Sequence, residues 1–255
     1  MLIVTVNNVY TISQDLSFLD TLVRFVLAKH SSSELCSVLV LLPNYKSAEV
    51  LQDIFSQSSN LLPKIKPIGS MDPEALIFAG FDIKPPVSAV QRKMMLMDLM
   101  IQKLELEPGL ALSLLAKAEN ILDELERQQL TEPTEDFGEL LGEVMRAYRA
   151  LLKAQGRSDI IEYRNSIIDG YARLWRQEPP HFPIIAAGST ASLPATRNLL
   201  RTIAGLSSGM VVVPNLALHM DDKEWSAIDE THHQYNLKSF LEYIGANRKD
   251  ISCLA

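Results

Sequence analysis

Cysteine is scarce in this chain, which has two residues of this type, Cys36 and Cys253, among 255. Two cysteines cannot supply a disulfide framework or a four-cysteine metal site. Long hydrophobic runs are also missing, since none approaches the roughly 20 apolar residues that span a bilayer. No basic segment followed by an apolar segment opens the chain either. These absences predict a cytoplasmic protein without a membrane anchor.

Positive charge is in deficit as well. The chain has 24 Lys and Arg against 31 Asp and Glu, and its formal net charge is −7 at pH 7. An acidic chain has no overall attraction to nucleic acid or anionic lipid, so any contact with DNA requires a local basic patch. Apolar residues, by contrast, are plentiful at 47%, which is enough for a substantial core in one large domain or two small ones.

A strand, helix, strand pattern occupies residues 184–214. Ile184–Ala187 and Met210–Val213 are apolar at every position, as in strands covered on both faces of a parallel sheet, and Leu193–Ala204 has helical spacing. The turn at residues 188–192 then follows the carboxyl end of a parallel strand, where open α/β sheets bind their ligands. We expect any site in this protein to lie near that edge.

The rest of the chain shows two kinds of hydrophobic pattern. Short apolar runs and helical stripes alternate before residue 87 and after residue 180, with strands expected at 2–6, 9–12, 38–42 and 65–68 and a last helix near 237–244. Residues 87–180 contain no strand-like run, and their apolar repeats have helical period. The first of these repeats consists of Val90, Met94, Met97, Ile101 and Leu104.

This pattern predicts an α/β fold with a parallel sheet, formed by residues 1–86 and 181–255. Residues 87–180 are predicted to be a helical subdomain inserted into that domain. The methionine-rich stripe is interpreted as core filling.

The turn after the strand at residues 38–42 resembles a phosphate-binding loop at one point, because it ends in Lys46-Ser47 at a helix start. The glycines of such a loop are absent, and the turn is Pro43-Asn44-Tyr45. A proline without an N–H and a bulky tyrosine are poorly suited to cradling an anion. An ordinary loop that leads into a helix is therefore the favoured interpretation.

The acid that would hold Mg²⁺ at the end of an inner strand is also missing, since Ala187 is followed by Gly188. Asp221 and Asp222 lie beyond the next strand and are predicted to be acids at a helix N-terminus. The sequence thus indicates the architecture of a nucleotide site without its catalytic groups, and no catalytic, cofactor-binding or metal-binding residue is predicted.

Several residues remain as candidates for contact with DNA or another anion. Ser189, Thr190 and Ser192 precede a helix and either bind an anion or cap that helix. Gly188 to Ser192 does not match the nucleophile elbow of hydrolases, so Ser189 is not predicted to be a nucleophile.

A basic stripe of Arg146, Arg149 and Lys153 has helical spacing and either contacts phosphates or is a solvated helix face. Lys46 and Arg197 are further candidates for DNA contact. His232 and His233 are adjacent, so on a helix or strand they should point apart, and they are predicted to be surface residues rather than metal ligands.

The order of several segments resembles the amino-terminal part of the AddB family. The carboxyl half contributes residues 183–204 (PIIAAGSTASLPATRNLLRTIA), 211–222 (VVVPNLALHMDD), Trp225 and 233–238 (HQYNLK). The amino half contributes residues 10–12 (YTI), 18–20 (FLD), 38–51 (VLVLLPNYKSAEVL), 61–69 (LLPKIKPIG) and 71–72 (MD). The resemblance covers nearly the whole chain.

AddB is the nuclease-bearing subunit of a bacterial helicase–nuclease that repairs double-strand breaks by homologous recombination. The resemblance implies a superfamily 1 helicase-like, P-loop NTPase-like fold that has lost its ATPase motifs, with an AddA-like helicase subunit as the partner. Tyr45-Lys46 stands where the family often has two arginines, which reduces the charge of that turn. Family members are several times longer, and the acidic ligands and cysteines of their nuclease region are not present in this chain.

Three hypotheses follow. The leading one is a non-catalytic scaffold domain of a DNA repair complex, which also guides DNA. The runner-up is a small α/β domain that binds a phosphorylated ligand at Gly188–Ser192. The third is a freestanding DNA-binding protein that uses Lys46, Arg197 and the stripe around Arg146.

Overall fold

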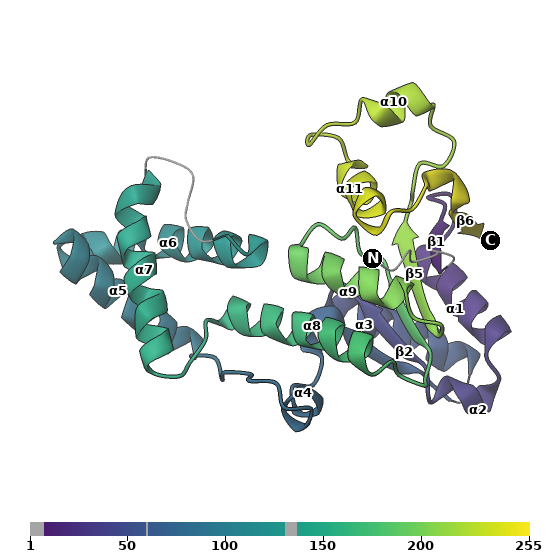
Figure 1. Ribbon diagram of the computed structural model, residues 1–255, viewed down its shortest axis with the longest axis horizontal. Coiled ribbons are helices and arrows are strands. Elements are labelled where there is room, and N and C mark those ends of the chain that lie inside the picture. The colour runs from purple at the N-terminus through teal and green to yellow at the C-terminus, as the bar shows by residue number, and fades with distance from the viewer. Residues whose placement is uncertain (1–7, 60, 131–136) are drawn as a thin grey trace. The chain divides into compact units, whose positions relative to one another are not determined.

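The structure is a computed structural model, and it describes residues 8–59, 61–130 and 137–255 (Figure 1). The strand expected at residues 2–6 lies outside the described residues. The chain divides into two compact units, Met1–Met71 with Ile168–Ala255, and Asp72–Ile167. The sequence placed the corresponding boundaries after residues 86 and 180. No helix of the described residues is long and apolar enough to cross a membrane.

The first unit is built on a six-stranded sheet in which all strands are parallel, so the α/β prediction with a parallel sheet is confirmed. The strand order is β3-β2-β4-β5-β1-β6. The strands are β1 (Val9–Ile12), β2 (Leu39–Leu42), β3 (Lys64–Pro67), β4 (Ile184–Ala187), β5 (Gly209–Pro214) and β6 (Ser252–Leu254). β4 lies at the centre, where Ile185 is in register with Val40 on one side and with Met210 on the other.

Helices cover both faces of this sheet, because its central strands are apolar on both sides. Alternate strand residues, including Val40, Ile185 and Val212, pack in one core cluster with α1 (Phe18–Lys29) and α3 (Tyr45–Ser58). The opposite face is covered by α9 (Pro194–Ala204), which packs on β4 and β5 (Figure 1). The other elements of this unit are α2 (Ser32–Leu35), η1 (Ile68–Ser70), α10 (Asp222–Ser226), α11 (Tyr235–Ile244) and η2 (Arg248–Asp250).

α9 lies between two other helices on its face of the sheet. The hydroxyl of Thr202 and the amide of Asn198 meet the carboxyl half of α8 (Ile160–Gln177), at Ala172 O and Asp169 Oδ1. The guanidinium of Arg201 lies 5.0 Å from the ring centroid of Tyr243 in α11. The outward side of α9 is therefore bordered by α8 and α11.

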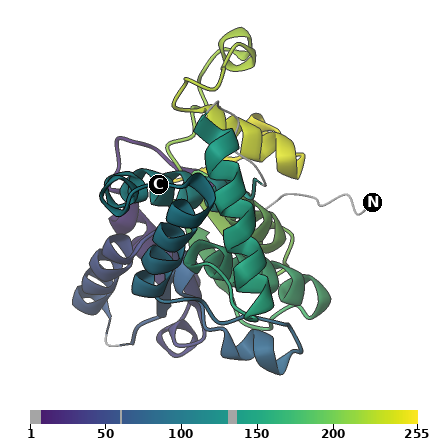
Figure 2. The same cartoon turned by 90° about the vertical axis from the view of Figure 1, so that its left-hand side faces the viewer.

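The second unit is helical, as the sequence predicts. It contains α4 (Glu74–Phe78), α5 (Ala89–Leu104), α6 (Pro108–Gln128), α7 (Phe137–Ala154) and the amino-terminal part of α8. α5 packs against both α6 and α7 (Figure 2). The only extended pairing within the described part of this unit is a single bridge between Pro86 and Ser158.

The core side of α5 agrees with the predicted stripe only in part. Met97, Ile101 and Leu104 are partly buried and pack against the core of this unit. Val90 and Met94 are 67% and 61% exposed, so their assignment to the core was wrong. The buried residues of α5 are Arg92, Leu96 and Met100, which recur every four residues and place a charged side chain inside the unit. The apolar pattern did not reveal this buried face of α5, because the first residue of the face is a charged arginine.

Arg92 is held by carboxylates from two other segments. Its Nε donates to Asp159 Oδ2 at 2.8 Å and its Nη2 donates to Asp123 Oδ1 at 2.6 Å. Tyr148 of α7 donates its hydroxyl to the same Asp159 oxygen at 2.9 Å. Asp159 Oδ1 in turn accepts from the backbone N–H of Ile161, at the start of α8. One buried network therefore joins α5, α6, α7 and α8.

Candidate functional site

The carboxyl edge of the sheet contains two positions where the chain leaves neighbouring strands toward opposite faces. α3 follows β2 on one face, and α9 follows β4 on the other. The second position lies between β1, which leads into α1, and its neighbour β5. Ligands of open α/β sheets bind in the crevice that such a divergence opens. The turns at residues 43–47 and 188–192, which were predicted from sequence, flank the first of these positions.

Two loops of this edge and the first residue of α1 meet around Gly188. Its backbone has φ of +78°, a conformation that side chains disfavour, and its N–H donates to Val212 O at 2.9 Å. A Cβ at this position would lie 3.4 Å from Phe18 Cε1 and 3.7 Å from Pro43 Cδ. The start of α1 and the loops that follow β2 and β4 are therefore in close contact at one point.

The turn after β2 uses its own side chain to complete the helix start. Asn44 is the N-cap of α3, and its Oδ1 accepts the Ser47 N–H at 2.9 Å. The Tyr45 side chain is 71% exposed, and its hydroxyl shares a hydrogen bond with that of Ser70. Lys46 is exposed in the first turn of the helix. The turn is therefore a helix start capped by its own asparagine, as the favoured interpretation expects.

The turn after β4 is also held by hydrogen bonds, both within the turn and from the first turn of α9. Ser189 Oγ accepts the Ala191 N–H at 3.2 Å, and Arg197 Nε donates to Ala191 O at 3.1 Å. Ala191 is buried with φ of +57°, an uncommon conformation for alanine. Thr190 and Ser192 are exposed. The N-cap of α9 is Leu193, which makes no side-chain cap, so the interpretation of the neighbouring hydroxyls as helix caps was wrong.

The second divergence, between β1 and β5, was not foreseen. Asn215 Nδ2 donates to Gln14 Oε1 at 3.2 Å, which links the loop after β5 to the loop after β1. Thr11 Oγ1 accepts the Leu216 N–H at 3.0 Å, and the buried Gln234 accepts the Ala217 N–H at 3.1 Å. For Thr11 a signal was present in the sequence, because it is a polar residue within the otherwise apolar run at residues 9–12. Gln234 stands among polar residues and gave no such signal.

The predicted basic stripe belongs to the second unit, whereas Lys46, the hydroxyls of residues 189–192 and Arg197 belong to the first. Arg149 is engaged in an ion pair with Glu126, with Nη2 2.7 Å from Oε1. Burial raises the pKa of Glu126, against the pull of Arg149. Arg146 and Lys153 are exposed on α7. The structure thus assigns Arg149 to packing between α6 and α7.

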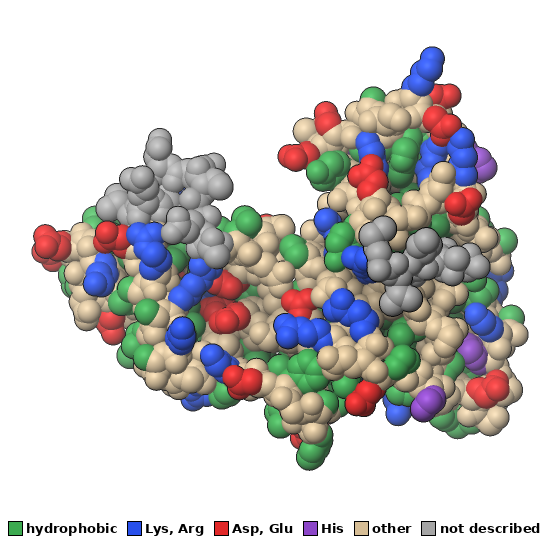
Figure 3. Space-filling model, viewed as in Figure 1, with side chains coloured by type: hydrophobic (Ala, Val, Ile, Leu, Met, Phe, Trp, Pro, Cys, Tyr) green, Lys and Arg blue, Asp and Glu red, His purple; other side chains and the backbone are tan. Residues whose placement is uncertain are grey.

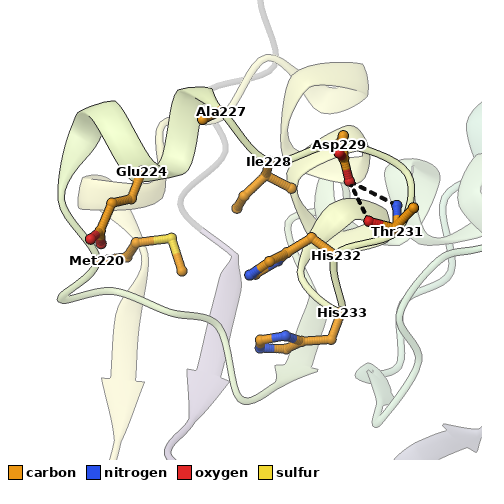
Figure 4. Close-up of a pocket in the computed structure, with 8 residues that line it drawn as sticks. All are labelled: Met220, Glu224, Ala227, Ile228, Asp229, Thr231, His232 and His233. Atoms are coloured by element: carbon orange, nitrogen blue, oxygen red, sulfur yellow. Dashed lines mark hydrogen bonds between the residues drawn. The ribbon is translucent and has the colours of Figure 1, made fainter.

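His232 and His233 lie in a turn, where their rings stack with centroids 4.4 Å apart (Figure 4). The expectation that they point apart was wrong because it assumed a helix or a strand. They line an open pocket with Met220 and Glu224 across from them. In the part of the chain that the structure describes, no three His, Cys, Asp or Glu side chains cluster as metal ligands.

The acids after β5 serve the short helix α10, as the sequence predicts. Asp221 is its N-cap, with Oδ1 2.8 Å from the Lys223 N–H, and Asp222 lies in its first turn. The Asp222 carboxylate bridges Arg248 Nη2 at 2.9 Å and Lys249 Nζ at 2.6 Å. These acids stabilise α10 and its contact with η2.

No protein-family model matches the sequence, and no curated protein matches it either.

Proposed function

We propose that this chain is a non-catalytic, helicase-like scaffold domain of an AddB-type subunit, within a complex that repairs double-strand breaks in DNA. In this proposal the sheet is a degenerate P-loop NTPase-like domain, the helical unit is an insertion in it, and an AddA-like helicase subunit in the cytoplasm is the partner. Two observations support the proposal. They are the structure of the sheet edge and the series of sequence segments that resembles the amino-terminal part of the AddB family.

The observation that carries the proposal is the state of the backbone amides at that edge. A triphosphate needs several N–H groups that point outward from one loop. Here the amides of Ser47 and Ala191 are hydrogen-bonded to side chains of their own turns, and the Leu216 amide is bonded to Thr11. The segments that follow β2, β4 and β5 therefore each use one backbone N–H in a hydrogen bond within the protein, so that this N–H does not point outward to a phosphate.

The side chains at the edge support the same conclusion. Ala186 and Ala187 end the central strand, where a nucleotide hydrolase places the carboxylate that holds Mg²⁺ through water. The turns after β1 and β2 have the sequences Ser13-Gln14-Asp15-Leu16-Ser17 and Pro43-Asn44-Tyr45, with no glycine. A fold that binds ligands at this edge remains, without the groups that hydrolyse a nucleotide.

A titration with a fluorescent ATP analogue in the presence of Mg²⁺ tests the loss of the nucleotide site. We expect no saturable binding at millimolar nucleotide and no release of phosphate by the purified chain. Saturable binding that unlabelled ATP reverses, or Mg²⁺-dependent hydrolysis, contradicts the proposal.

Co-purification with an AddA-like helicase subunit tests the scaffold role. The two chains, expressed together, should elute as one complex in size-exclusion chromatography. The two chains are mixed at concentrations on the order of micromolar, with either chain in up to about 10-fold excess. Separate elution under all these conditions argues against the role, because a scaffold has to bind its partner.

A second candidate function is binding of a phosphorylated ligand at residues 188–192. The observation in its favour is the left-handed conformation of the buried Ala191, because such outliers collect at ligand sites. Pyrophosphate should then raise the melting temperature, and the double substitution Thr190→Ala and Ser192→Ala should remove the rise. Ser207→Ala, another exposed serine of this unit, is the matched control. An unchanged rise in the double variant rejects the candidate.

A further inference from the structure

Four arginines gather on the outer side of α8 and α9 in the first unit. Arg173 and Arg176 lie on α8, and Arg197 and Arg201 lie on α9. Arg173, Arg176 and Arg201 are exposed, and Arg197 is half-buried. We refer to these four residues as the arginine face. Figure 3 shows Lys and Arg side chains gathered over these two helices.

Helix geometry explains why the four side chains share one side. Arg197 and Arg201 are four positions apart, and Arg173 and Arg176 are three positions apart. Residues at either spacing are neighbours on the same face of a helix. The two helices lie side by side, because Asn198 Nδ2 donates to Asp169 Oδ1 at 2.7 Å. The residues of α9 that contact the sheet, such as Leu199 and Ile203, are fully buried on its other side.

Within the part of the chain that the structure describes, the arginines of this face have no carboxylate partner. None of the four forms an ion pair with any acid in the described ranges, although Arg92, Arg149 and Arg248 each form at least one. Arg176 and Arg197 each direct Nε to a backbone carbonyl, and Arg201 covers the Tyr243 ring. In a chain with seven more acids than bases, this concentration of positive charge is unexpected.

We propose that the arginine face binds the phosphate backbone of DNA. Guanidinium groups match the geometry of phosphate oxygens and hold them by paired hydrogen bonds. The core of a protein–protein interface is apolar, but no large apolar side chain of α8 or α9 is exposed within the described residues. Charge without an apolar centre favours a polyanion as the ligand.

The inference deepens the proposed function by naming the surface that meets DNA, and it rests on that function for the choice of DNA over RNA. It needs no nucleotide site. Contacts of this kind are independent of sequence, since they reach phosphates and not base edges.

Fluorescence anisotropy with a labelled single-stranded DNA of about 20 nucleotides, measured over a range of salt, tests the face. The wild-type chain should bind more weakly as salt rises. The triple variant Arg173→Gln, Arg176→Gln and Arg201→Gln should lose at least about tenfold in affinity at low salt. The slope of log affinity against log salt should become shallower by about 2, since each lost phosphate contact removes about 0.7.

A control of equal charge separates a local effect from a global one. Arg24→Gln, Lys29→Gln and Lys64→Gln remove three exposed charges from α1 and β3, away from α8 and α9. This control should keep affinity within about twofold. Circular dichroism checks that both variants fold. Protection of the same arginines from phenylglyoxal by DNA in the wild-type chain, mapped by mass spectrometry, is a second measurement that requires no substitution.

Three outcomes overturn the inference. They are undetectable or salt-insensitive binding of DNA by the wild-type chain, equal losses in the triple variant and the control, and equally strong binding of polyglutamate at the same face, which would indicate an acidic protein partner. Nucleotide binding together with arginine-dependent DNA binding would reject the non-catalytic scaffold and leave the face intact. The reverse pattern would reject the face alone.

Discussion

Arg92 and Asp159 form a buried ion pair in the helical unit, with Arg92 Nε 2.8 Å from Asp159 Oδ2 and side chains that are 7% and 2% exposed. The pair connects the first turn of α5 to the residue that precedes α8, although 67 positions separate them in the sequence. The helical unit therefore depends on a charged centre as well as on its apolar core.

Arg92→Met should destabilise this unit strongly. The substitution keeps most of the side-chain volume but leaves the Asp159 carboxylate buried without its main partner, which costs about 3–5 kcal/mol. Denaturant unfolding followed by circular dichroism measures the loss. Arg127→Met is the matched control, since Arg127 is 44% exposed and pairs with Asp123 on the same helix, so about 0.5 kcal/mol is expected. Equal losses in the two variants would show that the buried pair has no special weight.

Tyr148 gives the helical unit a dependence on alkaline pH. Burial raises the pKa of Tyr148 above its ordinary value near 10, and the Asp159 carboxylate adds to the rise. The folded chain thus keeps this proton while the unfolded chain releases it, so the free energy of unfolding should fall as pH rises above 10. Tyr148→Phe cannot ionise and should show a shallower decline. Urea unfolding at several pH values measures the two slopes, and parallel slopes would contradict the prediction.

The central strands and long helices were predictable from sequence because their apolar patterns are strong. Ile184–Ala187 matches β4 at both ends, since every residue in it is buried. β6 was missed because it has three residues and two of them, Ser252 and Cys253, are exposed. Its place in the sheet comes from pairing with β1, which local pattern does not encode.

The candidate site was predictable only in part. The turn at Gly188 could be found because it follows a strong strand. The contact between Gln14 and Asn215 could not, because it joins loops 201 positions apart and depends on β1 lying beside β5. The same reason hid the arginine face, since α8 and α9 are neighbours only in the folded chain. Helical periodicity gives the face of one helix and leaves its neighbours undetermined.

Gly209 is required at the start of β5 by the close approach of another segment. A Cβ at this position would lie 1.9 Å from the backbone oxygen of Ile203, near the end of α9. Gly209→Ala should therefore force α9 away from the strand and destabilise the sheet unit by about 3 kcal/mol or more. Gly109→Ala is the control, because a Cβ there meets nothing within 4 Å, and in a helix alanine is favoured over glycine by up to about 1 kcal/mol. A thermal melt that ranks the two variants in the opposite order would refute the requirement.

Asp222 should make the attachment of α10 sensitive to acid. The hydrogen bond from Lys249 holds the pKa of Asp222 below its ordinary value of 3.8, with help from Arg248. Stability from this bridge is therefore complete above pH 3.8 and is lost as pH falls through the lower folded pKa. Trp225 reports on the event, since the Arg248 guanidinium lies 4.8 Å from its ring centroid.

In a Trp175→Phe background Trp225 is the remaining tryptophan, so its emission follows α10 alone. The emission should shift to longer wavelength in acid before the sheet unfolds, because the exposed bridge is weaker than the buried core beneath it. Asp222→Asn carries no charge at any pH, so its emission at neutral pH should already be shifted and should not respond in this acid range. A transition of the same midpoint in both variants would mean that another carboxylate holds α10 in place.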